Sequence, residues 1–350
     1  MSVAERASKI STWRTLAEQG DATAQYELGR CYSKGEGVTK DDTEAVNWFR
    51  KAAEQGYAKA QNNLGWCHYK GEGVTKDDKE AIKWYLKAAE QGDVKAQNNL
   101  GLCCYNGEGS VADKAEAAKW FRKAADQEDA DAQFNLGLCY SKGEGVIADK
   151  AAAATWFRKA ADQGCADAQF NLGLCYSKGE GVIADKAEAV KWYRKAVEKE
   201  FPNAQFRLGV CYDYGEGVIA DKVEAVKWYR KAAEQGFAGA QYILGLCYSE
   251  GAGVIQNKVE AVKWYRKATE QGHARAQFNL GISHLNGEGA LEDFVEAYKW
   301  LLLAGASGCE EAFAMRKKIT EKMTEAQISE AKERAGKWQQ EFSRSHPTSK

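Results

Sequence analysis

A spacing of 36 residues runs through almost the whole chain and limits what it can fold into. Seven cysteines keep it, at Cys31, Cys67, Cys103, Cys139, Cys175, Cys211 and Cys247, and so do eight tryptophans, at Trp48, Trp84, Trp120, Trp156, Trp192, Trp228, Trp264 and Trp300. A fixed period of this length is typical of a supersecondary unit stacked on copies of itself. We place eight repeats, at 21–56, 57–92, 93–128, 129–164, 165–200, 201–236, 237–272 and 273–308.

Each repeat has the pattern of two helices. In the first repeat, Leu28, Cys31 and Tyr32 follow Ala24 at the spacing of one helical face. Gly35 ends this helix because glycine tolerates the left-handed conformation that a helix stop needs. A second helix follows, with its own apolar face of alanine, tryptophan and an aromatic residue. The sequence therefore predicts helix pairs and no sheet.

The second helix carries a start signal in nearly every repeat. Asp41 with Glu44 predicts a capping box, in which the aspartate accepts a backbone N–H and the glutamate reaches back to the cap. The fourth repeat lacks the glutamate, because Ala152 stands there. At the closing end, Glu128 and Glu200 replace the usual glycine.

Small residues mark a close approach of the two helices. Gly29 and Ala45 fall where a larger side chain would push the helices apart. The columnar tryptophans are expected to fill the gap between neighbouring repeats.

The run from Ala168 through Gln169, Leu172-Gly173 and Tyr176, continuing to Trp192, resembles the Sel-one-like repeat, a relative of the tetratricopeptide repeat. The resemblance implies an all-α fold, a right-handed α/α superhelix of eight two-helix repeats with terminal capping helices. We expect an N-terminal capping helix in 1–20, the repeats in 21–308, C-terminal capping helices in 309–343 and a disordered tail in 344–350. Thr324 is expected to cap the closing helix. Members of this family resemble adaptors and scaffolds, and no common catalytic residue is carried over.

Composition narrows the class of partner. The chain has 49 basic and 50 acidic residues, a net charge of −1, which gives no electrostatic reason to bind nucleic acid. No stretch approaches the roughly 20 apolar residues that a membrane helix needs. The first residues, from Met1 to Trp13, do not resemble a secretory signal. We therefore expect a cytoplasmic, monomeric protein with a protein or peptide partner, no nucleic acid and no membrane insertion.

The sequence offers little chemistry. The Gly-x-Gly loops follow a helix rather than a strand and lack the other residues of a phosphate-binding motif. One cysteine per repeat leaves neighbours too far apart for disulfides, so buried free thiols are expected, with Cys165 and Cys309 the more exposed ones. Cys67 and His68 are adjacent on a helix and do not face each other. We expect no catalytic residue, no cofactor and no metal site.

Two functions remain as hypotheses. The first is a binding module that receives a protein or peptide on the concave face of the array. The second is a hydrolase of the β-lactamase-like kind, which is linked to a cysteine-rich branch of the family. Departures from the repeat consensus that cluster in one cleft would favour the enzyme, and departures spread along the inner face would favour binding. In the sequence they are most frequent in the first three repeats and at the ends.

The predicted binding surface uses two places on the first helix of each repeat, two residues before and two residues after the leucine of Leu-Gly. In repeats four to eight the first place holds Phe134, Phe170, Phe206, Tyr242 and Phe278, and the second holds Leu138, Leu174, Val210, Leu246 and Ile282. Stacked, these residues would form an apolar stripe for an amphipathic helix or an extended peptide. The alternative is that the stripe is part of the core between repeats.

Overall fold

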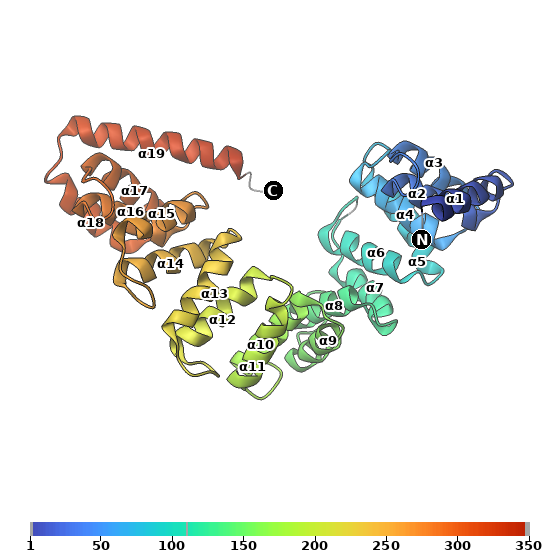
Figure 1. The fold of residues 1–350 in the computed structure, drawn as a ribbon, viewed down its shortest axis with the longest axis horizontal. Coiled ribbons are helices and arrows are strands. Elements are labelled where there is room, and N and C mark those ends of the chain that lie inside the picture. The colour runs from blue at the N-terminus through green and yellow to red at the C-terminus, as the bar shows by residue number, and fades with distance from the viewer. Residues whose placement is uncertain (1–2, 110, 347–350) are drawn as a thin grey trace. The chain divides into compact units, whose positions relative to one another are not determined.

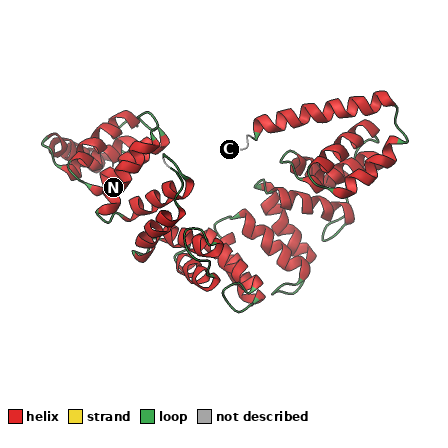
Figure 2. Ribbon diagram, turned by 180° about the vertical axis from the view of Figure 1, so that it is seen from behind, coloured by secondary structure: helices red, strands yellow, loops and turns green. Residues whose placement is uncertain are grey.

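A computed structural model describes residues 3–109 and 111–346, and within them the chain forms nineteen helices and no strand (Figure 2). The expected all-α solenoid of paired helices is confirmed. Two compact units divide the chain, one comprising residues up to 175 with 179–183, and the other 176–178 with the residues from 184 onward. Figure 1 labels the helices in chain order.

The helices of the first half begin with α1 and then form the pairs of repeats one to four. Their bounds are α1 Val3–Glu18, α2 Ala22–Lys34, α3 Asp42–Glu54, α4 Ala58–Lys70, α5 Asp78–Glu90, α6 Val94–Asn106, α7 Lys114–Asp126, α8 Ala130–Lys142 and α9 Lys150–Asp162. The second half contains α10 Ala166–Lys178, α11 Lys186–Val197, α12 Pro202–Tyr214, α13 Lys222–Glu234, α14 Ala238–Glu250, α15 Lys258–Thr269, α16 Ala274–Asn286, α17 Phe294–Ala306, α18 Glu310–Thr320 and α19 Glu325–Ser345.

The second helices begin where the sequence predicts, but their caps are simpler than expected. Asp41 accepts a hydrogen bond from the backbone N–H of Glu44 at 3.0 Å, and Asp149 caps its helix even with Ala152 in the glutamate place. The second part of the predicted capping box, in which the glutamate side chain accepts from the backbone N–H of the cap residue, is wrong. Instead, the glutamates face a side chain three residues later, as in the 2.9 Å ion pair of Glu116 with Lys119. A lysine one turn along offers a full opposite charge, whereas the cap backbone offers one N–H.

Helix ends follow the glycine pattern closely. Gly35 has φ of 69°, and the N–H groups of Gly35 and Glu36 both donate to the carbonyl of Cys31. At the two junctions without glycine, Glu128 and Glu200 adopt φ of 65° and 57°, so the same turn is kept at the strain that a side chain causes there.

Core clusters within the array join two successive repeats, and those at its ends join a repeat to a terminal helix. The cluster of α3 with the following repeat contains Phe49, Leu64, Cys67 and Trp84, and the columnar tryptophans are buried except Trp228, which is half-buried. The close approach within a repeat is confirmed as well, because a methyl group added at a first-helix glycine would lie 2.7 Å from an aromatic ring of the second helix, as between Gly29 and Phe49.

A ladder of buried glutamines also links the repeats. Gln61 donates from its side-chain amide to the Ala53 carbonyl at 3.1 Å, and its own oxygen accepts from Gln91 at 2.7 Å. The same two hydrogen bonds recur at Gln97 and Gln241. This polar ladder fixes the register of neighbouring repeats because each buried amide is satisfied only in one alignment.

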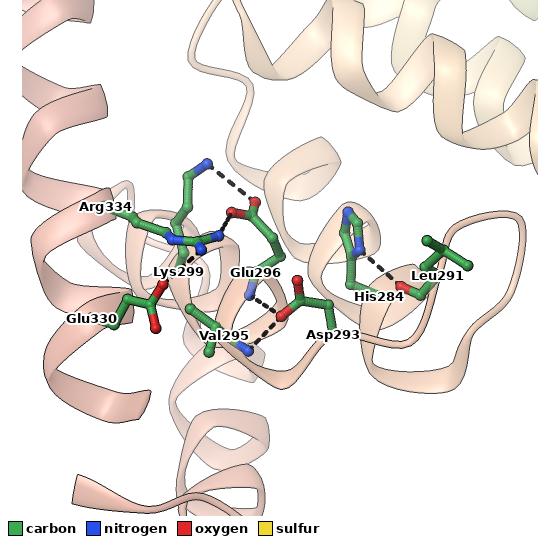
Figure 3. A network of polar contacts seen from close by, with 8 residues as sticks. All are labelled: His284, Leu291, Asp293, Val295, Glu296, Lys299, Glu330 and Arg334. Atoms are coloured by element: carbon green, nitrogen blue, oxygen red, sulfur yellow. Dashed lines mark hydrogen bonds and ion pairs between the residues drawn. The ribbon is translucent and has the colours of Figure 1, made fainter. Parts of the chain in front are cut away.

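Two terminal helices follow the last repeat. Figure 3 shows how α19 meets α17: Arg334 donates to Glu296 at 2.7 Å and to Glu330 at 2.6 Å, and Lys299 pairs with the same Glu296 at 3.1 Å. Thr324 forms a complete capping box with Gln327, as predicted for the start of this helix.

The expected tail boundary is corrected by α19, which continues through Ser345. Residues 347–350 of the expected tail lie outside the described part of the chain, and so do residues 1–2 of the expected N-terminal cap. The capping roles of 1–20 and 309–343 remain proposals.

Candidate functional site

The ten stripe residues predicted from the sequence share one degree of burial. All of them are half-buried, and none is fully buried or fully exposed. They lie on α8, α10, α12, α14 and α16, the first helices of repeats four to eight. The stripe is described for each unit separately: Phe134, Leu138, Phe170 and Leu174 belong to the first unit, and the other six residues belong to the second.

The aromatic members of the stripe also pack inside the array. The Phe134 ring lies 5.9 Å from that of Phe157, and the Phe206 ring lies 5.7 Å from that of Tyr229 on the second helix of its repeat. Phe206 further contacts Phe237 at the start of the next repeat, with ring centroids 5.1 Å apart. The first place of the stripe therefore belongs partly to the core between repeats.

The aliphatic members form what we call the first-helix row, the residues two positions after the leucine of Leu-Gly. In the second unit Val210, Leu246 and Ile282 rest against core clusters with one side and keep some exposure. Sequence reasoning missed two members of this row. Trp66 and Leu102 are 41% and 36% exposed, so the row begins in the second repeat. Their 36-residue spacing from the other members could have identified them. The predicted stripe required an apolar residue at both places, and repeats two and three have a polar residue, such as Asn98, at the first place.

Polar contacts lie beside this row between successive first helices. The Asn99 amide donates to Asn62 at 3.0 Å, and the Asn135 amide donates to Asn98 at the same distance. Asn62 and Asn98 occupy the first place of the stripe in repeats two and three. Amide pairs therefore hold the first helices together where the aromatic residues are missing.

The cysteines behave as structural thiols. All seven columnar cysteines are buried and none of them forms a disulfide, as predicted. Cys165 is half-buried, but the expectation for Cys309 is wrong: it is only 7% exposed, at the start of α18, where its thiol donates to Glu311 at 3.3 Å. The packing of α18 on α17 covers it, which the sequence of the junction does not reveal.

The adjacent Cys67 and His68 do not form a nucleophile with its base. Burial raises the pKa of the Cys67 thiol to about 12, whereas a reactive cysteine needs a lowered pKa. Burial also lowers the pKa of His68, which keeps its ring neutral. Among the described residues, no group of three or more His, Cys, Asp or Glu side chains is placed to hold a metal ion.

None of the helices in the described ranges combines the length and apolar character that a membrane span requires. The site that the structure offers is therefore a surface of partly exposed apolar side chains on the first helices.

The comparisons agree with this architecture. The Sel1 repeat model matches residues 22–57, 58–93, 94–129, 130–165, 166–201, 202–237, 238–273 and 274–309. A Sel1 repeat protein from Oxalobacter formigenes is 35% identical, with 88% of this chain and 89% of that one covered and a TM-score of 0.69. A protective antigen of uropathogenic Escherichia coli strains with an SLR fold is 29% identical over 96% of this chain and 95% of that one, with a TM-score of 0.60. No curated protein sequence matches the chain. With eight matched repeats arranged as stacked helix pairs, the chain belongs to the Sel1 repeat family.

Proposed function

We propose that this chain is an interaction scaffold that binds a protein or peptide along the first helices of its repeats, the concave face of the array. Sel1 repeat proteins are generally protein-interaction scaffolds. The observation that carries the proposal is the first-helix row, an apolar side chain at the same helical place in seven successive repeats that keeps partial exposure in each. Apolar surface that recurs in one place favours a partner, because its removal from water drives association.

The hydrolase alternative receives no support from the described residues. A nucleophilic enzyme needs an activated side chain, a base and a group that orients the base. Burial raises the pKa of columnar thiols such as Cys103, where it reaches about 12. A monomeric state and a cytosolic location stay predictions.

The test uses two leucines of the row in one unit. Leu138→Gln with Leu174→Gln removes apolar surface from half-buried positions and places the polar amide where water can reach it. Crosslinking with mass spectrometry first identifies a partner, and calorimetry with the purified partner then measures its Kd. We expect Kd to rise at least about tenfold, because two apolar contacts contribute more than about 1.4 kcal/mol. The melting temperature should fall by no more than about 3 °C.

Two control variants separate binding from folding. Leu136→Gln lies on the same helix but is fully buried, so it should lower stability by several kcal/mol. Ile147→Gln makes the same chemical change on a loop residue that is 91% exposed and should leave Kd and stability unchanged. If the Leu138 and Leu174 changes destabilise the chain as Leu136→Gln does, the row is core and the proposal fails.

A further inference from the structure

The loop after each first helix is seated on the preceding repeat by a glycine. A methyl group added at Gly181, Gly217 or Gly253 would overlap the backbone carbonyl of the first residue of the preceding second helix. For Gly253 that residue is Lys222, at the start of α13. The residue before each of these glycines is therefore held close to the preceding helix start.

In every repeat but the seventh this residue is a glutamate, and in repeats five, six and eight it pairs with the lysine at that helix start. Glu180 lies 3.2 Å from Lys150, and Glu288 lies 2.9 Å from Lys258. In the seventh repeat the glutamate is replaced by Ala252. Lys222 turns instead to Asp213 of its own repeat, at 2.8 Å, a place that holds serine in repeats one, four, five and seven.

A cavity of about 180 Å³ lies at this junction, between α12, α13 and α14. Ala252 and Lys222 both line it, so it occupies the region that a loop glutamate would fill. Its remaining wall combines apolar side chains, among them Ile243 and Leu246, with the aromatic ring of Tyr214. Leu246 is a member of the first-helix row, which makes the cavity continuous with the proposed binding surface.

Several lining residues depart from the consensus of the other repeats. Ile243 stands where five repeats have asparagine, and Glu250 stands where four repeats have lysine. Tyr214 is 74% exposed. The expectation that such departures gather in the first three repeats and at the ends misses this group, because residues 37 positions apart meet here only through the packing of α12 on α14.

The charge of the lining favours a cation. Asp213 and Glu250 are acidic and Lys222 is the single base, a net charge of −1. Asp213 is already engaged, since it also accepts a hydrogen bond from the Tyr229 hydroxyl at 3.2 Å. Glu250 has no ion pair within the described part of the chain. Because Lys222 offsets Asp213, a guest carboxylate would be repelled by the uncompensated charge of Glu250, whereas a guest cation would be attracted to it.

We propose that this cavity is a pocket for the arginine or lysine side chain of a bound peptide segment. The aliphatic stem of the guest lies along Ile243, Leu246 and the Tyr214 ring, and its cationic head faces Glu250. The proposal rests on the scaffold function and adds the chemistry of the partner: a segment with a basic residue among apolar ones.

The side chains that line the cavity also argue against a catalytic site. Cys247 lines it, but burial, with Asp213 nearby, raises the pKa of this thiol to about 11. Burial and Asp213 likewise raise the pKa of the Tyr229 hydroxyl. Neither group is activated as a nucleophile, so the cluster of departures fits recognition better than reaction.

The test is a methyl NMR titration of the full chain with three capped amino acids. N-acetyl-arginine amide should shift the Ile243 methyl resonance saturably at concentrations up to about 50 mM, which detects a Kd in the millimolar range. N-acetyl-norleucine amide should shift it less, and N-acetyl-glutamate amide should not shift it. The methyl of Ile255, a 91% exposed loop residue, serves as the internal reference and should stay unchanged.

Two variants return the pocket to the repeat consensus and are therefore expected to fold. Ala252→Glu supplies the missing partner of Lys222 and fills the cavity, and Glu250→Lys reverses the free charge. Each should weaken the arginine response about tenfold or more. Ala220→Glu is the matched control: it adds the same group on an exposed loop place where the eighth repeat has Glu292, and the response should be retained.

An unshifted Ile243 methyl, an equal response to the glutamate compound, or a response that survives both variants would overturn the pocket. These outcomes leave the scaffold function standing, because that function is tested separately by the partner affinity of the Leu138 and Leu174 variant.

Discussion

The glutamine ladder gives a quantitative test of how neighbouring repeats are coupled. Gln61 is 4% exposed, and Gln61→Met keeps its length while it removes both hydrogen bonds, to the Ala53 carbonyl and from Gln91. Both partners keep another contact: the Ala53 carbonyl also accepts from the Gly56 N–H, and the Gln91 amide also donates to the Lys87 carbonyl. The expected cost is therefore that of two net hydrogen bonds, not that of two buried orphan groups.

The magnitude follows from these contacts. Each net hydrogen bond contributes about 0.5–1.5 kcal/mol, so Gln61→Met should cost about 1–3 kcal/mol. Gln91→Met also removes the bond to the Lys87 carbonyl, which is solvent-exposed and can be replaced by a bond to water, so its expected cost of about 1 kcal/mol comes from the bond between the two side chains. Because this bond is lost in both single variants, the double variant should be less destabilised than the sum of the two by about that amount.

Hydrogen exchange with mass spectrometry is the suitable assay, because a repeat array does not unfold as one two-state unit. Peptides from α3 and α4 should exchange about 5- to 150-fold faster in Gln61→Met, the ratio that corresponds to 1–3 kcal/mol. Peptides from α13 should be unchanged, since coupling acts between nearest neighbours. Gln339→Met, an exposed change on α19, is the control.

The reasoning would be refuted by exchange in α3 and α4 that changes less than about twofold, or by strictly additive effects of the two glutamine changes. Additive effects would mean that the 2.7 Å hydrogen bond from the Gln91 amide to the Gln61 oxygen contributes nothing to the free energy of unfolding.

Three further predictions test the packing. Gly101→Ala places a methyl group 2.6 Å from the Phe121 ring and should lower the stability measured in a thermal melt by about 1–3 kcal/mol. At Gly336 the added methyl group of Gly336→Ala has no neighbour within 4 Å, and this change should stabilise its helix by about 0.5–1 kcal/mol. Equal effects of the two changes would contradict the close approach of the helices. Burial raises the pKa of Cys67 from its usual 9.0 to about 12, so the thiol of the unfolded chain loses its proton first and the free energy of unfolding should fall between about pH 9 and pH 12. Cys67→Ala should make that fall less steep in urea titrations at different pH values. An unchanged slope would argue against the raised pKa. Deletion of 309–350 exposes the apolar side of the last repeat, and light scattering should detect aggregation of the truncated chain; a truncation as well behaved as the full chain would exclude the capping role.

The helices themselves could be predicted almost completely from the sequence. The start of α3 after Asp41 and the end of α2 at Gly35 follow from residues within one turn, because capping and helix stops depend on groups a few positions apart. The close pairing of the two helices was also predictable, since Gly29 leaves room for only one arrangement with Phe49.

Contacts between repeats were decided by the tertiary structure. Gln61 meets the carbonyl of Ala53 in the preceding repeat, and Lys258 meets the loop residue Glu288 of the following repeat, because stacking brings together positions that no helical period connects. The exposure of Trp66, the burial of Cys309 and the cavity beside Ala252 have the same origin. A repeating pattern determines each helix pair by short-range physics, whereas the surface left for a partner depends on which side chains of successive pairs cover one another.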